Sequence, residues 1–193
     1  SNYRAVQPTG PVPGDLVGRR AEPLPYRFDL ERARRLLAEA GYPEGRDPAT
    51  GKRLEFTLDI GRADDLELRQ SAELFTSFMD QIGVVIRTVY NNWPNYLDKL
   101  DRRQVQLYIL RWIADYPDAD NFLQLFNGRN VSPGPNHSNY VNADYDALYN
   151  EASVLPDSPE RTRLYLKMQD ILVEDVPWIF ASDLLVFILQ QPR

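Results

Sequence analysis

Residues 54–90, which read LEFTLDIGRADDLELRQSAELFTSFMDQIGVVIRTVY, decide the fold class. Apolar side chains alternate over residues 54–60 and predominate over residues 84–90, which is typical of strands. Between these runs, apolar residues recur at spacings of four and three from Leu68 to Ile82, as on one face of a helix. A strand, a helix and a second strand in succession predict a βαβ unit with parallel strands. We therefore expect an α/β fold with a mainly parallel sheet flanked by helices.

The stretch before this unit divides into two parts. Residues 1–25 contain five prolines and three glycines and cannot sustain a helix. We predict that they form an extended linker or a lobe-crossing segment, and that residues 26–193 form an α/β ligand-binding lobe. Asp29 precedes apolar residues at helical spacing, which predicts a helix over residues 30–40 with Asp29 as its N-cap.

After the βαβ unit, the pattern predicts a short helix at residues 94–100 and a third strand at residues 105–110. The segments 61–65, 91–93 and 112–120 each follow the carboxyl end of a predicted strand. Parallel strands place these ends at one edge of the sheet, where open α/β sheets bind their ligands. We expect the three segments to form the wall of a cleft.

Residues 112–122 read WIADYPDADNF and combine large aromatic side chains with three aspartates. Trp112 and Tyr116 could supply apolar surface, and a carboxylate beside them could hold a cationic group. The alternative is a solvated turn in which Asp120 or Asn121 caps the next helix. Composition alone leaves both interpretations open.

The carboxyl-terminal third predicts two helices and a strand. Residues 127–139 are rich in Gly, Pro, Asn and Ser, which favours a ligand-facing or mobile loop over a core segment. Helices are expected at residues 144–153 and 159–174, the second signalled by the capping pair Asp157 and Glu160. The apolar run 184–189 is too short to span a bilayer and predicts a buried strand.

Composition argues against several classes of function. The net charge of -6 is unfavourable for binding nucleic acid, because phosphate contacts require clustered Lys and Arg. The sequence contains no cysteine, and its single histidine, His137, lies in a polar loop, so a zinc site is not expected. The aspartates of residues 112–122 lack the Gly and Glu positions of a calcium-binding EF-hand loop. We predict no metal and no cofactor.

A hydrolase that uses paired carboxylates is the alternative from the enzyme class. Asp115 could act with Asp64 or Glu151, because sequence does not give their separation in space. However, the sequence has no nucleophile elbow, no zinc-protease motif and no phosphate-binding glycine loop. We therefore expect a binding protein without catalytic residues.

Three segments resemble the same protein family, in the same order. Residues 26–45 match Y-x-x-D-x-x-x-A-x-x-L-L-x-E-A-G-Y-P-x-G, residues 112–122 match W-x-A-D-Y-P-D-x-x-N-F, and residues 139–148 match N-Y-x-N-x-x-Y-D-x-L. Asp175, Val176 and Pro177 follow at the expected distance. These segments resemble the family 5 extracellular solute-binding proteins, the peptide-binding components of ABC importers.

The resemblance implies a set of ligand-binding residues. In peptide-binding members, the Asp of W-x-A-D-Y holds the amino terminus of the ligand, and that residue is Asp115 here. From their residue types, Trp112 and Tyr116 are expected to supply apolar surface, and Asp118 and Asp120 to shape the loop and cap the helix. Further candidates, each with a structural alternative, are Tyr140 (a packed Tyr), Asn139 (a turn Asn) and Trp93 (a Trp that closes the core).

The resemblance also implies the context of the chain. Family members are longer, two-lobed proteins, so the chain resembles the carboxyl-terminal lobe of a type II-like periplasmic-binding-protein fold. We expect a monomeric substrate-binding component that captures small peptides for the membrane permease of an ABC transporter and binds no nucleic acid. Other members bind sugars, nickel chelates or opines, which remain alternatives. The implied location is periplasmic or extracellular, with or without a lipid anchor on the full-length protein.

Overall fold

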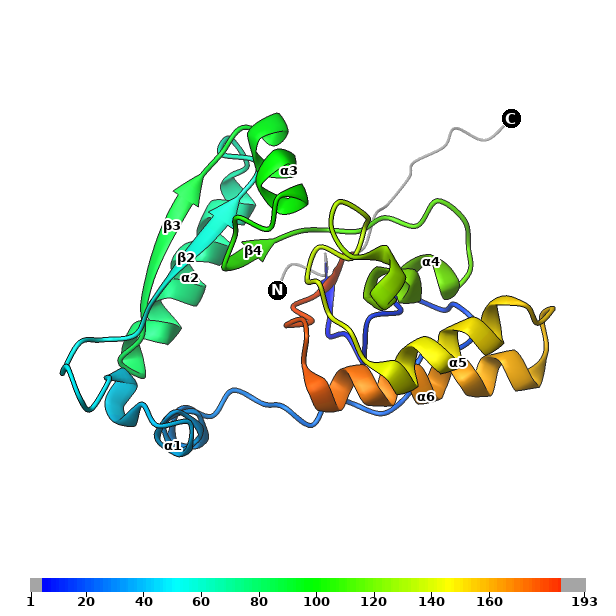
Figure 1. Ribbon diagram of the computed structural model, residues 1–193, viewed down its shortest axis with the longest axis horizontal. Helices are drawn as coiled ribbons and strands as arrows, with labels where there is room; N and C mark the ends of the chain where they lie inside the picture. The colour runs from blue at the N-terminus through cyan, green and yellow to red at the C-terminus, as the bar shows by residue number, and fades with distance from the viewer. Residues whose placement is uncertain (1–4, 185–193) are drawn as a thin grey trace. The chain divides into compact units, whose positions relative to one another are not determined.

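The computed structural model describes residues 5–184 (Figure 1), and these divide into two compact units. Unit 2 is the continuous segment Arg27–Arg111. Unit 1 combines the residues up to Tyr26 with those from Trp112 onward. The predicted boundary between a linker (residues 1–25) and a ligand-binding lobe (residues 26–193) is a different division, and it stays a prediction.

Unit 2 contains the predicted βαβ unit. Strand β2 (Glu55–Ile60) lies between β3 (Val85–Tyr90) and β4 (Leu107–Ile109), and both neighbours run parallel to it. Helix α2 (Leu66–Gln81) connects β2 to β3. The α/β class and the parallel sheet are therefore confirmed, as is the third strand, although β4 is shorter than residues 105–110.

One face of this sheet forms an apolar core with helices. Leu58 and Ile60 of β2 pack with Leu68 and Ala72 of α2, and Leu37 of α1 (Leu30–Glu39) lies at the edge of the cluster. Asp29 caps α1 as predicted, by accepting a hydrogen bond from the backbone N–H of Arg32 at 2.9 Å. A short 3₁₀ turn, η1 (Pro43–Gly45), follows α1.

An ion pair between the buried Asp59 and the partly exposed Lys99 ties α3 (Trp93–Asp101) to the sheet. Asp59 of β2 is 2% exposed, and its carboxylate accepts hydrogen bonds from the Lys99 ammonium at 2.7 Å and from the Asn91 side chain at 2.8 Å. Tyr96 of α3 is fully buried and donates to the carbonyl of Ile109 at 2.8 Å. These contacts fix α3 at the carboxyl end of β2.

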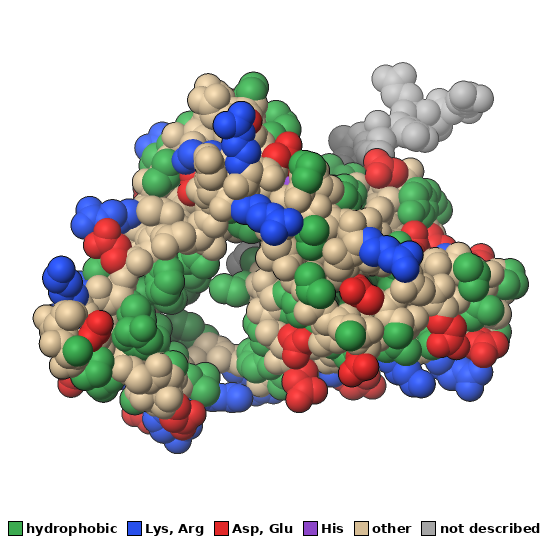
Figure 2. All heavy atoms as spheres, viewed as in Figure 1, with side chains coloured by type: hydrophobic (Ala, Val, Ile, Leu, Met, Phe, Trp, Pro, Cys, Tyr) green, Lys and Arg blue, Asp and Glu red, His purple; other side chains and the backbone are tan. Residues whose placement is uncertain are grey.

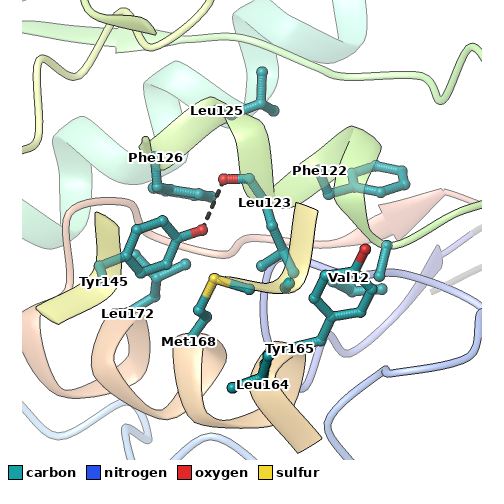
Figure 3. Packing of buried hydrophobic residues seen from close by; sticks show 12 residues of the cluster. Val12, Phe122, Leu123, Leu125, Phe126, Tyr145, Leu164, Tyr165, Met168 and Leu172 are labelled. Carbon is teal, nitrogen blue, oxygen red and sulfur yellow. Dashed lines mark hydrogen bonds between the residues drawn. The ribbon is translucent and has the colours of Figure 1, made fainter. Parts of the chain in front are cut away.

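Unit 1 is mainly helical, with α5 (Ala143–Ser153) and α6 (Pro159–Asp175) side by side in Figure 1. Ahead of them come α4 (Asp120–Leu123) and the 3₁₀ turns η2 (Gln124–Phe126) and η3 (Gly128–Asn130). The Tyr145 hydroxyl of α5 donates to the Leu123 carbonyl of α4 at 2.7 Å (Figure 3). Leu123 and Met168 are fully buried in the same cluster, so α4 is locked onto α5 and α6.

The segment before Tyr26 packs onto α6. Val12 is fully buried in the unit 1 core, and strand β1 (Ala5–Val6) pairs antiparallel with β5 (Asp183–Leu184). The buried Gln169 side chain of α6 donates to the Gly18 carbonyl at 2.6 Å. Whether the segment also links two lobes stays a prediction. Of the predicted strand 184–189, residues 185–189 lie outside the described residues.

Three local predictions for unit 1 are wrong. Ser158, not Asp157, caps α6 by accepting from the Arg161 N–H at 3.2 Å. Neither Asp120 nor Asn121 is the N-cap of α4, because the helix begins at Asp120. Finally, Asn127 and Asn136 are buried, so part of the loop 127–139 belongs to the core instead of facing a ligand or solvent.

Candidate functional site

The segment from Trp112 to Phe122 is organised by one buried amide, that of Asn121. Asn121 is 0% exposed, and its side-chain oxygen accepts from the Trp112 indole N–H at 2.7 Å and from the Asp115 backbone N–H at 3.3 Å. Its side-chain nitrogen lies 3.5 Å from Oδ2 of Asp115 and donates to it. From the sequence, Asn121 was a motif position and an alternative helix cap, and its contacts to Trp112 and Asp115 were not predicted.

The three residues predicted to form the ligand anchor lie in this one segment. Trp112 is half-buried against the unit 1 core, while Asp115 is exposed. Tyr116 is 44% exposed and its hydroxyl donates to Asp120 at 2.9 Å. Partial burial and the Asp120 carboxylate raise the pKa of Tyr116 above its ordinary value. The segment therefore combines an exposed carboxylate with two partly exposed aromatic side chains.

Asp118 has a different role from Asp115. Its carboxylate accepts from Arg161 of α6 at 2.7 Å, from the Tyr165 hydroxyl at 3.2 Å and from the Asp120 N–H at 2.8 Å. Burial alone would raise the pKa of Asp118, but the Asp120 N–H and the Arg161 guanidinium outweigh this effect and lower the pKa. Asp118 thus attaches the segment to α6, which confirms its predicted role in shaping the loop.

The lowered pKa of Asp118 makes the stability of the chain depend on pH. A carboxylate with a lower pKa in the folded than in the unfolded state stabilises the fold above its unfolded pKa, and this contribution is lost as pH falls through the folded pKa. Asp118→Asn is expected to lower the free energy of unfolding at pH 7 by about 1 to 3 kcal/mol and by less at pH 3. Urea unfolding at both pH values measures this. The exposed Asp144→Asn is the control, and an equal loss at the two pH values would contradict the role of Asp118.

A hollow of about 430 Å³ lies in unit 2 at the carboxyl ends of β2 and β3. Residues 61–64 and 90–93 line it, so two of the three segments expected at one edge do meet. The third segment, residues 112–120, belongs to unit 1. That it forms a cleft wall with the other two stays a prediction. Trp93, the first residue of α3, lines the hollow and is 45% exposed, so it does not close the core.

The remaining two predicted site residues make structural contacts. The Tyr140 hydroxyl donates to Asp175, and its ring packs edge-on against Phe126 with centroids 6.5 Å apart. Asn139 has a φ of 54°, and its side-chain oxygen accepts from the Ser132 N–H at 3.0 Å. These contacts account for both residues without a ligand, and their ligand-binding roles stay predictions.

The described part of the chain contains neither a metal cluster nor a membrane-crossing helix. Within residues 5–184, no three His, Cys, Asp or Glu side chains lie close enough together to hold a metal ion. None of the helices in that range has the length and apolar character needed to cross a membrane. On the face drawn in Figure 2, Lys and Arg side chains are interspersed with acidic and apolar ones.

Comparison with known proteins gives a family match and close relatives. The family model described as bacterial extracellular solute-binding proteins, family 5 (middle part), matches residues 2–133. The heme-binding protein A of Haemophilus influenzae is 32% identical over 184 residues, which is 95% of this chain and 32% of that protein. The di/tripeptide-binding protein 1 of Pseudomonas aeruginosa is 29% identical over 150 residues, which is 78% of this chain and 27% of that protein.

A solved structure confirms the fold class. The periplasmic binding protein DppA from Helicobacter pylori, in complex with the peptide STSA, superposes with a TM-score of 0.84 at 27% identity. The match covers 94% of this chain and 34% of that one. This chain therefore spans about a third of the length of the proteins it matches.

Proposed function

The chain belongs to the family 5 bacterial extracellular solute-binding proteins, and from this premise we propose that it forms one lobe of a longer, two-lobed protein that captures small peptides for an ABC importer. In this proposal Asp115 binds the α-ammonium group of the peptide. Trp112 and Tyr116 contribute apolar surface around it, at little cost in side-chain entropy. Trp93, Asn139 and Tyr140 are proposed as further contacts.

The observation that carries the proposal is the exposure of the Asp115 carboxylate and its contact with a neutral side chain. It is exposed, and it is held by the neutral amide of Asn121. Asp118, three residues later, is instead paired with Arg161, which already compensates its charge. A carboxylate oriented by a neutral group keeps its full charge for a cationic ligand, and charge-assisted hydrogen bonds to carboxylates are among the stronger polar contacts.

The relatives support a peptide as the ligand and also define the alternatives. Two of the three reported above are named for peptides or contain one, and the third is named for heme. Sugars, nickel chelates and opines remain alternatives within the family resemblance. We also propose, for the full-length protein, a monomer that docks on a membrane permease from a periplasmic or extracellular location, with or without a lipid anchor.

Native mass spectrometry of the full-length protein, purified without refolding, tests the proposed function. We expect co-purified peptides with free amino termini, recovered with their original masses. Adding such a peptide at about a hundred times its Kd should stabilise the protein by about 2.7 kcal/mol, because it binds only the folded state. Recovery of heme or a metal chelate instead would overturn the peptide assignment. Cleaved peptide that disappears in Asp115→Asn would favour the hydrolase alternative.

A further inference from the structure

We propose that Asn121 is the positioning residue of the ligand anchor, and that it makes this site selective for ligands with a free cationic amino terminus. The inference rests on the proposed function of Asp115. In this inference the buried Asn121 side chain orients the exposed carboxylate of Asp115 toward the ligand.

The side-chain contacts of Asn121 converge on the anchor. An amide oxygen has two lone pairs, and here they accept from the Trp112 indole N–H and from the Asp115 backbone N–H. The amide nitrogen donates to Oδ2 of Asp115. One side chain therefore fixes an aromatic wall, the backbone at the anchor and the carboxylate itself.

Asn121 is held in a rigid part of unit 1. It is the second residue of α4, directly before Phe122 and Leu123, which belong to the buried core cluster. Figure 3 draws both residues in the same cluster as Tyr165 and Met168 of α6. Because Asn121 is fully buried and its backbone is set by this packing, its amide cannot turn away without leaving polar groups unpaired.

The neutrality of the amide is the reason for the proposed selectivity. A cation at this position would pair with Asp115, as Arg161 pairs with Asp118, and would cancel the charge that the ligand needs. An acid would repel the carboxylate and raise its pKa. A neutral donor orients Asp115 and leaves its charge in place.

The test measures the preference for a free over a blocked amino terminus, using a randomised tripeptide mixture of which half is N-acetylated. In the full-length wild type, native mass spectrometry should show free-amine peptides strongly enriched among those bound. In Asn121→Ala the enrichment is expected to fall by about tenfold or more, equivalent to about 1.4 kcal/mol. Gln169→Ala is the matched control, because it removes another fully buried amide from the same unit and should keep the enrichment.

The outcomes separate this inference from the proposed function. A wild type that retains no peptide, or an Asp115→Asn variant that keeps the enrichment, would overturn the proposed function. If Asp115→Asn loses the enrichment while folded Asn121→Ala keeps it, only the role of Asn121 is wrong.

If Asn121→Ala does not fold, the near-isosteric Asn121→Asp provides the second test. It retains both acceptor contacts and places a second carboxylate beside Asp115. When ionised it no longer donates to Oδ2 of Asp115, so its enrichment for free-amine peptides is expected to fall by about tenfold or more. An enrichment equal to that of the wild type would overturn the positioning role.

Discussion

Replacing Asp115 with asparagine in the full-length protein is expected to weaken binding of a peptide with a free amino terminus by about 2 to 5 kcal/mol. This is the usual cost of removing one partner of a buried, hydrogen-bonded charge pair. In the chain described here Asp115 is exposed, so an ion pair at this residue in the isolated chain should contribute at most about 1 kcal/mol. The large effect therefore depends on enclosure of Asp115 by the second lobe of the proposed function.

Isothermal titration calorimetry of wild type and Asp115→Asn with the same peptide measures this loss. Glu151→Gln removes another exposed carboxylate of unit 1 and should bind like the wild type. The N-acetylated peptide should bind both proteins with the weak affinity of the variant. Equal affinity of wild type and Asp115→Asn for the free-amine peptide would rule out the anchor role.

Replacing Lys99 with methionine is expected to lower the free energy of unfolding by about 3 to 5 kcal/mol. The substitution keeps most of the volume of the side chain but leaves the Asp59 carboxylate, 2% exposed, without its cation. The Asn91 amide still donates a hydrogen bond to Asp59. One neutral donor does not offset the cost of burying an unpaired carboxylate. Urea unfolding followed by circular dichroism measures the change.

The same helix offers a matched control. Arg102 pairs with Asp98 at 2.9 Å across one turn of α3, and both side chains are exposed. Arg102→Met should therefore cost no more than about 0.5 kcal/mol. The double variant Lys99→Met with Asp59→Asn should recover part of the loss, because the buried charge is then absent. A loss in Lys99→Met as small as that of Arg102→Met would show that the Asp59–Lys99 pair does not stabilise the fold.

The parts of the fold that could be predicted are those in which local pattern and tertiary packing agree. The alternation before Ile60 and the helical spacing from Leu68 to Ile82 each reflect a single apolar face, and both faces pack into the same core. The cap at Asp29 was predictable because a cap is decided within one helical turn. The segment 112–122 could be singled out because its composition is unusual and its motif is specific.

The parts that could not be predicted depend on contacts between distant residues. Asp59 and Lys99 are 40 residues apart, and a single charged residue in an alternating strand normally indicates a solvated face. The burial of Asn136 also depends on tertiary contacts, because its side chain donates to the carbonyls of Asn127 and Tyr140. The polar composition of the loop 127–139 does not indicate these contacts. Asn121 could be predicted in part. The motif includes it, but its burial and its contacts to Trp112 and Asp115 are known only from the structure.

In the sequence, unit 2 lies between the two parts of unit 1, and this order determines which unit can fold first during synthesis. Unit 2 is complete in sequence at Arg111, so its sheet can form while the remainder of the chain is still being made. Unit 1 must wait, because Gln169 binds Gly18 across 151 residues. Until α6 emerges from the ribosome, the early segment that holds Val12 has no core to join. Unit 1 therefore bears the slow, non-local step of folding, and its core stays open to aggregation for longer than that of unit 2.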